Sequence, residues 1–181
     1  MFLPLLGVTL LLWRYVLEKP LLEMSQAVVE VSFALLPGAG TDEVVTVDGN
    51  GDWLVYPAAL VRKKATMSRS GLRCFSVSLP TFWALALGVS RKTSLWRVLG
   101  SGTLLLTIVS QLSVVLYVAC WALYDAGRWP TATPLLNAAA YFLVDVVPYA
   151  FPPAVLIWLD SGLRSLVFGE SRQKTLPGRT A

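Results

Sequence analysis

Residues 98–124 read VLGSGTLLLTIVSQLSVVLYVACWALY, without one charged side chain. An α-helix rises about 1.5 Å per residue, so roughly 20 apolar residues cross the hydrocarbon core of a bilayer. This stretch exceeds that length and is predicted to be a transmembrane helix. Two further apolar stretches predict the same, FLPLLGVTLLLWRYVL at residues 2–17 and LLNAAAYFLVDVVPYAFPPAVLIWL at residues 135–159.

The composition agrees with a chain that lies mostly in lipid. Only 14% of the 181 residues are charged and 55% are hydrophobic, whereas soluble domains carry about 25% charged residues. The sequence has no histidine, which excludes Ser-His-Asp triads, Cys-His dyads and imidazole metal sites. We therefore predict no catalytic residue, no metal and no cofactor. The net charge of +4 does not predict nucleic-acid binding, because the basic residues lie at the ends of apolar stretches.

A fourth, shorter apolar stretch, FSVSLPTFWALALGVS at residues 75–90, fits either a short crossing or a re-entrant segment. The charges of the flanking segments decide between the two. Lys and Arg number three in residues 91–97 and four in residues 160–181, but one in residues 125–134. Cytoplasmic loops are enriched in Lys and Arg, so the counts predict four spans with both termini in the cytoplasm.

The segment between the first two spans is predicted to lie outside and to begin with a helix. Polar residues at 23, 26 and 30 recur at helical spacing among apolar ones, and the pattern stops at Leu36-Pro37-Gly38. Two β-prone runs follow, Glu43–Val47 and Asp52–Tyr56, around the turn sequence Asp48-Gly-Asn-Gly51. This pattern predicts a β-hairpin, and a third run, Leu72–Ser78, is expected to add a strand.

The sequence thus predicts a mainly α membrane protein with four transmembrane helices and a small extracytoplasmic β-hairpin segment. The first span reads as an uncleaved anchor, because no small-x-small cleavage site follows it. The expected segments are a first transmembrane helix (1–17), an extracytoplasmic amphipathic helix plus hairpin (18–74), a short second transmembrane helix (75–90), a basic cytoplasmic loop (91–97), a third transmembrane helix (98–124), an outer loop (125–134), a fourth transmembrane helix (135–159) and a basic cytoplasmic tail (160–181).

Asp145 is the charge nearest the middle of a predicted span, where an ionised carboxylate is costly unless it is paired or protonated. Gln111 falls at a similar depth in the preceding antiparallel span, so the two are predicted to form a polar pair. The pair would hold the helices together or dock a partner protein; a proton or substrate step is the alternative. Prolines 148, 152 and 153 are expected to kink the same span.

Four further polar or reactive side chains lie near the outer end of the predicted spans. Cys74 and Cys120 would form a disulfide if they meet on an oxidising face, although a cysteine within a span is usually a small apolar residue. Arg14 and Glu18 are spaced i, i+4 at the end of the first span. They can pair or extend to the interface, and neither predicts a special role.

The layout resembles the exosortase H-associated membrane proteins, small inner-membrane proteins that accompany exosortases. The resemblance is carried by the opening FLPLLGVTLLLWRYVLEKPL, the LLPG helix ending, the VDGNGDWLVY hairpin and the SLPTFWALALGVSRK segment. It implies a multi-pass protein of the inner membrane of a Gram-negative bacterium that works beside an exosortase in protein sorting. Exosortases use a Cys with Arg and His, and this chain lacks His, so sorting activity itself is not expected.

The expected function is therefore that of a non-enzymatic accessory protein, with the lipid bilayer and another membrane protein as partners and no nucleic acid. The partner is the exosortase if the resemblance holds. A small transporter or channel component that uses Asp145 is the alternative. An enzyme that uses Cys74 as nucleophile is a third reading, but the sequence offers no general base for it.

Overall fold

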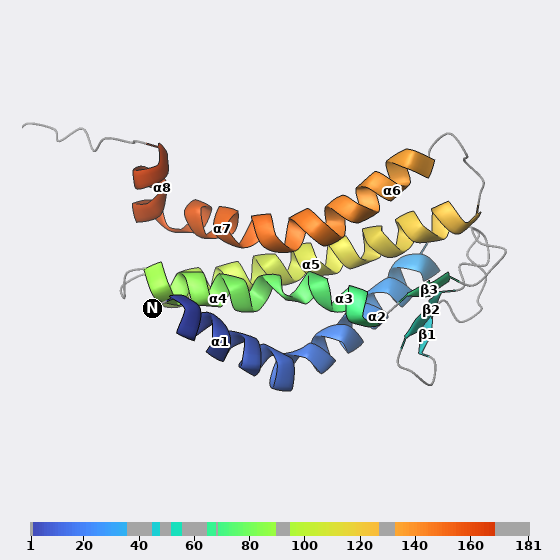
Figure 1. Cartoon of the computed structure of the whole chain (residues 1–181), viewed down its shortest axis with the longest axis horizontal. Helices are drawn as coiled ribbons and strands as arrows, with labels where there is room; N and C mark the ends of the chain where they lie inside the picture. The colour runs from blue at the N-terminus through green and yellow to red at the C-terminus, as the bar shows by residue number, and fades with distance from the viewer. Residues whose placement is uncertain are drawn as a thin grey trace, which may run out of the picture.

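The computed structural model describes residues 2–35, 45–47, 52–55, 65–67, 69–89, 95–126 and 133–168, and this part of the chain is mainly α-helical (Figure 1). Three of its helical stretches are long and apolar enough to cross a membrane: Leu72–Val89, Leu95–Trp121 and Pro134–Leu159. They overlap three of the apolar stretches predicted from the sequence. The chain is thus built as a membrane protein.

The first apolar stretch and the amphipathic segment after it form one bent helix (Figure 1). It consists of α1 (Phe2–Leu12), the π-helical turn η1 (Trp13–Leu17) and α2 (Glu18–Ala34). In η1 the backbone N–H of Glu18 donates to the carbonyl of Trp13, five residues back. Pro20 has no N–H to offer the carbonyl one turn before it, and the wider π turn falls at that point.

The next helix replaces the third strand that the sequence predicted. α3 (Arg69–Ser76) leads directly into α4 (Ser78–Val89), so the prediction of a strand over Leu72–Ser78 is wrong. Leu72 and Phe75 are both buried in the core, at the i, i+3 spacing of one helix face. Packing of this face against other helices outweighs the β-prone composition of the run.

Two long helical segments follow, and the first ends and the second begins at the end of the bundle that carries the sheet (Figure 1). The first is α5 (Leu95–Ala126). The second comprises α6 (Thr133–Tyr141), the π-helical turn η2 (Phe142–Val146) and α7 (Val147–Leu159), and the short α8 (Ser161–Phe168) comes after it.

The irregular turn in the last span lies before its prolines, not among them. In η2 the N–H of Val147 donates to the carbonyl of Phe142, five residues back. Pro148 removes the donor for the carbonyl four residues before it, so the distortion appears on the N-terminal side of the proline. The helix then continues through Pro152 and Pro153. The predicted disturbance is therefore present but displaced toward the sheet end of the span.

A three-stranded antiparallel sheet caps one end of the bundle. β1 (Val45–Val47) pairs with β2 (Trp53–Val55), and β2 pairs with β3 (Ala65–Met67), in the order β1-β2-β3. β1 and β2 lie inside the two runs expected to pair, while residues 48–51, the expected turn, lie outside the described residues. β3 was not predicted.

Trp53 attaches this sheet to the helices. Its side chain is buried in a core cluster with residues of α2, α3 and α5, and a large buried aromatic side chain contributes several kcal/mol of apolar burial. Three short strands make a marginal sheet by themselves, so this contact stabilises it. The other buried members of the cluster are Val29, Phe33, Leu72, Phe75, Val114 and Val118.

A second core cluster joins α4, α5 and α7 toward the opposite end. The helices α4 and α5 approach closely here, because a Cβ atom on Gly102 would lie 2.0 Å from the ring of Phe82. Only glycine fits this crossing. The buried members of the second cluster are Leu79, Phe82, Ala86, Val98, Leu106, Val155 and Leu156.

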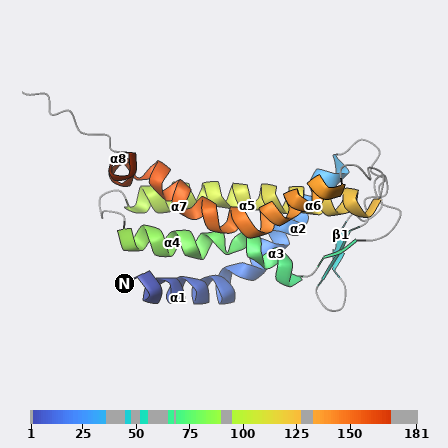
Figure 2. The same ribbon diagram turned by 45° about the horizontal axis from the view of Figure 1, so that its top comes forward.

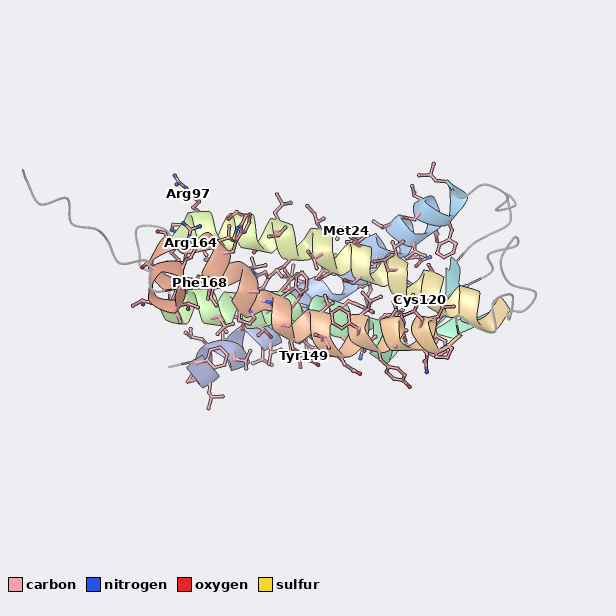
Figure 3. All side chains as sticks on the ribbon, turned by 90° about the horizontal axis from the view of Figure 1, so that it is seen from above. Met24, Arg97, Cys120, Tyr149, Arg164 and Phe168 are labelled. Carbon is pink, nitrogen blue, oxygen red and sulfur yellow. The ribbon has the colours of Figure 1, made fainter. Side chains whose placement is uncertain are left out.

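The elements meet at two distinct ends of an elongated bundle (Figures 1 and 2). The start of α1, the end of α4, the start of α5 and all of α8 lie at one end. The sheet, the end of α5 and the start of α6 lie at the other. We call these the basic end and the sheet end, since Arg97 and Arg164 lie at the first (Figure 3).

Candidate functional site

Glu18 is the buried centre of an ion cluster, and its pairing with Arg73 was not predicted from the sequence. Its side chain is only 5% exposed, at the start of α2. Oε2 lies 2.5 Å from Nη1 of Arg14, and Oε1 lies 2.5 Å from Nε of Arg73. Each carboxylate oxygen therefore has its own guanidinium partner, and the two partners come from different helices.

The local fold places these three groups together. Arg14 lies on the π turn η1 and Glu18 begins the next helix, so the i, i+4 pair spans the bend. Arg73 belongs to α3, which packs against α2. Burying a carboxylate without a partner is costly, whereas two adjacent cations, of which Arg14 also donates a hydrogen bond, compensate much of that cost. The cluster therefore joins the first bent helix to the second.

Asp145 is placed very differently. It lies on η2, close to the midpoint of the Pro134–Leu159 span, and its side chain is exposed. The nearest side chains on the same face, Tyr141 and Tyr149, are exposed as well. At this depth an exposed surface faces either lipid or another protein. An intramembrane carboxylate normally faces a protein interior or a paired group, and here the chain itself does not cover it.

The structure does not bring Asp145 and Gln111 together. Leu143 and Val144 pack against the first core cluster, whereas the neighbouring Asp145 is exposed. The Oε1 atom of Gln111 is buried, and within the described part of the chain no hydrogen-bond partner reaches it. The predicted polar pair is thus absent from the described contacts, although the two residues do belong to helices that pack together.

Serines form a polar link between a different pair of helical segments from the pair that Gln111 was expected to join. Ser110 Oγ donates to the carbonyl of Phe75 at 2.9 Å, and it lies 3.1 Å from Oγ of Ser78. All three groups are buried. Small hydroxyl side chains let helix backbones approach closely while satisfying each other. The link therefore holds α5 against the junction of α3 and α4.

The two cysteines are not joined by a disulfide. Both are partly buried, Cys74 on α3 and Cys120 on α5. Among the residues that the structure describes, no group of three His, Cys, Asp or Glu side chains is placed to hold a metal ion.

No family model matches this chain, and no curated protein or solved structure shows significant similarity to it. The geometry of Asp145 and of the ion cluster is therefore the basis on which its function is inferred.

The Glu18 cluster and Asp145 share one local feature, a π-helical turn that a proline follows in the sequence. Arg14 lies on η1 and Asp145 on η2, and a proline follows each turn closely, Pro20 and Pro148. A proline inside a long apolar stretch can thus indicate where a span will widen. π turns are frequent at functional sites, and here each carries an ionisable side chain of an apolar stretch.

Proposed function

We propose that this chain is a non-enzymatic accessory protein of a bacterial inner membrane that crosses the bilayer four times and docks another membrane protein. α1 with η1 is the first span, in addition to the three apolar helices described above. Support comes from α1, which packs along α4 from end to end of that helix (Figure 2). The second support is the basic end, where Arg97 lies in the first turn of α5 and α8 carries Arg164, both from segments rich in Lys and Arg as expected of the cytoplasmic side.

Reporter fusions test this topology directly. Fusions after Pro57, Thr93, Pro130 and Ala181 are expected to read outside, inside, outside and inside. The paired strands would then form an extracytoplasmic β-hairpin segment. A cytoplasmic reading after Pro57 would refute four spans with both termini inside.

The exposed carboxylate of Asp145 is the observation that carries partner docking. A charged residue at the centre of a transmembrane helix costs about 2.5–3.5 kcal/mol for insertion on translocon scales. Packing against the described residues does not offset this cost, since the side chain is exposed. A partner helix with a basic or hydrogen-bond-donating side chain at the same depth would offset it, and the flanking tyrosines offer further contact area.

The resemblance to exosortase-associated proteins suggests that the partner is an exosortase. The test is co-purification of the tagged chain with the exosortase from mild detergent. Asp145→Leu should lose the partner, Asp145→Glu should retain it, and Trp158→Leu, at an exposed position near the end of the same helix, should leave it unchanged. Equal recovery with Asp145→Leu and with the native chain would refute docking through this residue.

Stability of the isolated chain separates docking from a structural role. Asp145→Leu should unfold no more readily than the native chain, because it removes an uncovered carboxylate. A loss of stability would mean that Asp145 supports the fold and would remove the argument for a partner. Deleting the gene should impair processing of C-terminally tagged substrates, and normal processing would refute the sorting role.

A transporter or channel component is less well supported by the same geometry. A carboxylate that takes part in transport lines a path through protein or water, whereas Asp145 is exposed on the surface of the bundle. Asp145→Asn in purified, reconstituted chain would abolish transport if this reading were right. Docking predicts no ion flux from either form.

A further inference from the structure

An open groove of about 760 Å³ runs along the bundle between α1, α4 and α5. Its size lies within the range of about 300–1,000 Å³ typical of small-molecule sites. It extends from Trp96, at the basic end of α5, to Thr107 near the middle of that helix. The groove therefore lies at membrane depth, in the half of the bundle nearest the basic end.

Three of the polar side chains that line this groove, Thr9, Trp83 and Thr103, make hydrogen bonds within the chain. Thr9 Oγ1 lies 3.0 Å from the carbonyl of Pro80, to which it donates, and this contact holds α1 on α4. The indole N–H of Trp83 donates to Oγ1 of Thr103 at 2.8 Å. The remaining lining is largely Leu and Trp side chains. The groove thus fits an apolar occupant, because it offers few unsatisfied hydrogen-bonding groups.

The mouth of the groove at the basic end has a different character. Trp96 is 83% exposed at the rim, as is typical of indole rings at head-group depth. The next residue, Arg97, is exposed and lies one turn before Gly100 of the lining. Arg164 of α8 lies at the same end (Figure 3). Arg97 and Arg164 are both exposed at this end, so it attracts an anion.

We propose that this groove binds one acyl chain of an anionic phospholipid, with the phosphate beside Arg97. An apolar channel with a cationic mouth matches the amphiphilic shape and the charge of such a lipid. Juxtamembrane Lys and Arg attract the anionic head groups of the cytoplasmic leaflet. Only the assignment to that leaflet depends on the topology proposed above. The groove and its charge are independent of Asp145, which lies on another helix.

Two glycines allow a matched test of this site. Gly100 lines the groove and Gly7 does not, yet a Cβ added at either position would meet no atom within 4 Å. Gly100→Phe should therefore fill the groove without straining the fold, and Gly7→Phe should add an equal aromatic group to the outer face of α1. Equal thermal unfolding midpoints of the two variants would verify that both are folded.

The measurement is native mass spectrometry of the full chain in mild detergent, titrated with phosphatidylglycerol or with phosphatidylcholine of the same acyl chains. Gly100→Phe should weaken the first phosphatidylglycerol adduct at least tenfold, and Gly7→Phe should leave it unchanged. Arg97→Gln should weaken phosphatidylglycerol about fivefold, since one basic residue near anionic lipid contributes about 1 kcal/mol. Phosphatidylcholine binding should not respond to Arg97→Gln.

Three outcomes would overturn the proposal. Undiminished binding by Gly100→Phe would show that the lipid lies elsewhere. Equal affinity for the two lipids would show that the site does not recognise an anionic head group. A native chain that is dimeric by light scattering and becomes monomeric with Gly100→Phe would show that a second copy of the chain, not a lipid, occupies the groove.

Discussion

Replacing Glu18 by Gln should destabilise the protein far more than the same change at other glutamates of the first bent helix. The substitution preserves the shape of the side chain but removes the negative charge between Arg14 and Arg73. Removing one partner of a fully buried ion pair costs about 3–5 kcal/mol. The arginine side chains here are 47% and 29% exposed, so water partly solvates them after the change. We therefore expect a loss of about 2–3 kcal/mol.

The chain contains a matched control for this change. Glu23 lies 3.8 Å from Lys19 with the same i, i+4 spacing, but their side chains are 66% and 80% exposed. Such a surface pair contributes about 0–1 kcal/mol, so Glu23→Gln should have little effect. The assay is unfolding in mixed micelles as the fraction of sodium dodecyl sulfate rises, followed by tryptophan fluorescence. A double change of Glu18 and Arg73 to Gln should recover part of the loss, because the unpaired guanidinium is removed as well.

Equal unfolding of Glu18→Gln and Glu23→Gln would refute the reasoning. It would mean that water reaches the carboxylate of Glu18 as freely as that of Glu23. A double variant less stable than Glu18→Gln would refute the part assigned to Arg73, because that guanidinium would then contribute through other contacts.

Three further predictions concern packing, an interhelical hydrogen bond and a helix cap, each measured by the same unfolding assay. Gly102→Ala should destabilise by about 1–3 kcal/mol through overpacking against Phe82, whereas Gly100→Ala should not destabilise; equal effects would refute the close approach of α4 and α5. Ser110→Ala should cost about 0.5–1.5 kcal/mol through loss of its buried hydrogen bond, and an unchanged midpoint would show that the bond contributes nothing. Asp160 accepts the N–H groups of Gly162 and Leu163 at the start of α8, so Asp160→Ala should cost about 1 kcal/mol and lower helicity there; unchanged helicity by hydrogen exchange would contradict the cap.

The apolar helices could be predicted from the sequence because a bilayer requires only that a spanning segment be apolar and long enough. A long uncharged stretch is enough to predict a helix when the bilayer offers no partner to backbone groups. The composition of the run Leu72–Ser78 predicts a strand, because composition alone does not show that Leu72 and Phe75 pack on one helix face. The strand β3 could not be predicted for a related reason. Ala65–Met67 has little β propensity of its own, and its pairing with Trp53–Val55 is a tertiary contact.

The candidate site was less predictable, because depth and direction are separate properties of a helical residue. Rise per residue placed Gln111 and Asp145 at similar depth, but helical phase decides which way each side chain points. The π turn η2 holds an i to i−5 bond, and such a turn changes the phase of the residues on it. The cluster at Glu18 shows a different limit. Its pairing with Arg14 follows from local spacing, whereas its pairing with Arg73 depends on the packing of α2 against α3.

The two π turns lead to opposite uses of charge. At η1, Arg14 and the following Glu18 meet a second arginine from another helix, so the charges are compensated within the chain and contribute to its folding. At η2, Asp145 faces outward, and folding of this chain alone leaves its carboxylate uncovered. An uncovered carboxylate at membrane depth raises the free energy of the isolated chain, and only a contact with another molecule would offset that cost. The ion cluster at Glu18 therefore helps to explain how the helices are held together, and the exposed carboxylate of Asp145 is the group through which we propose that the chain docks a partner.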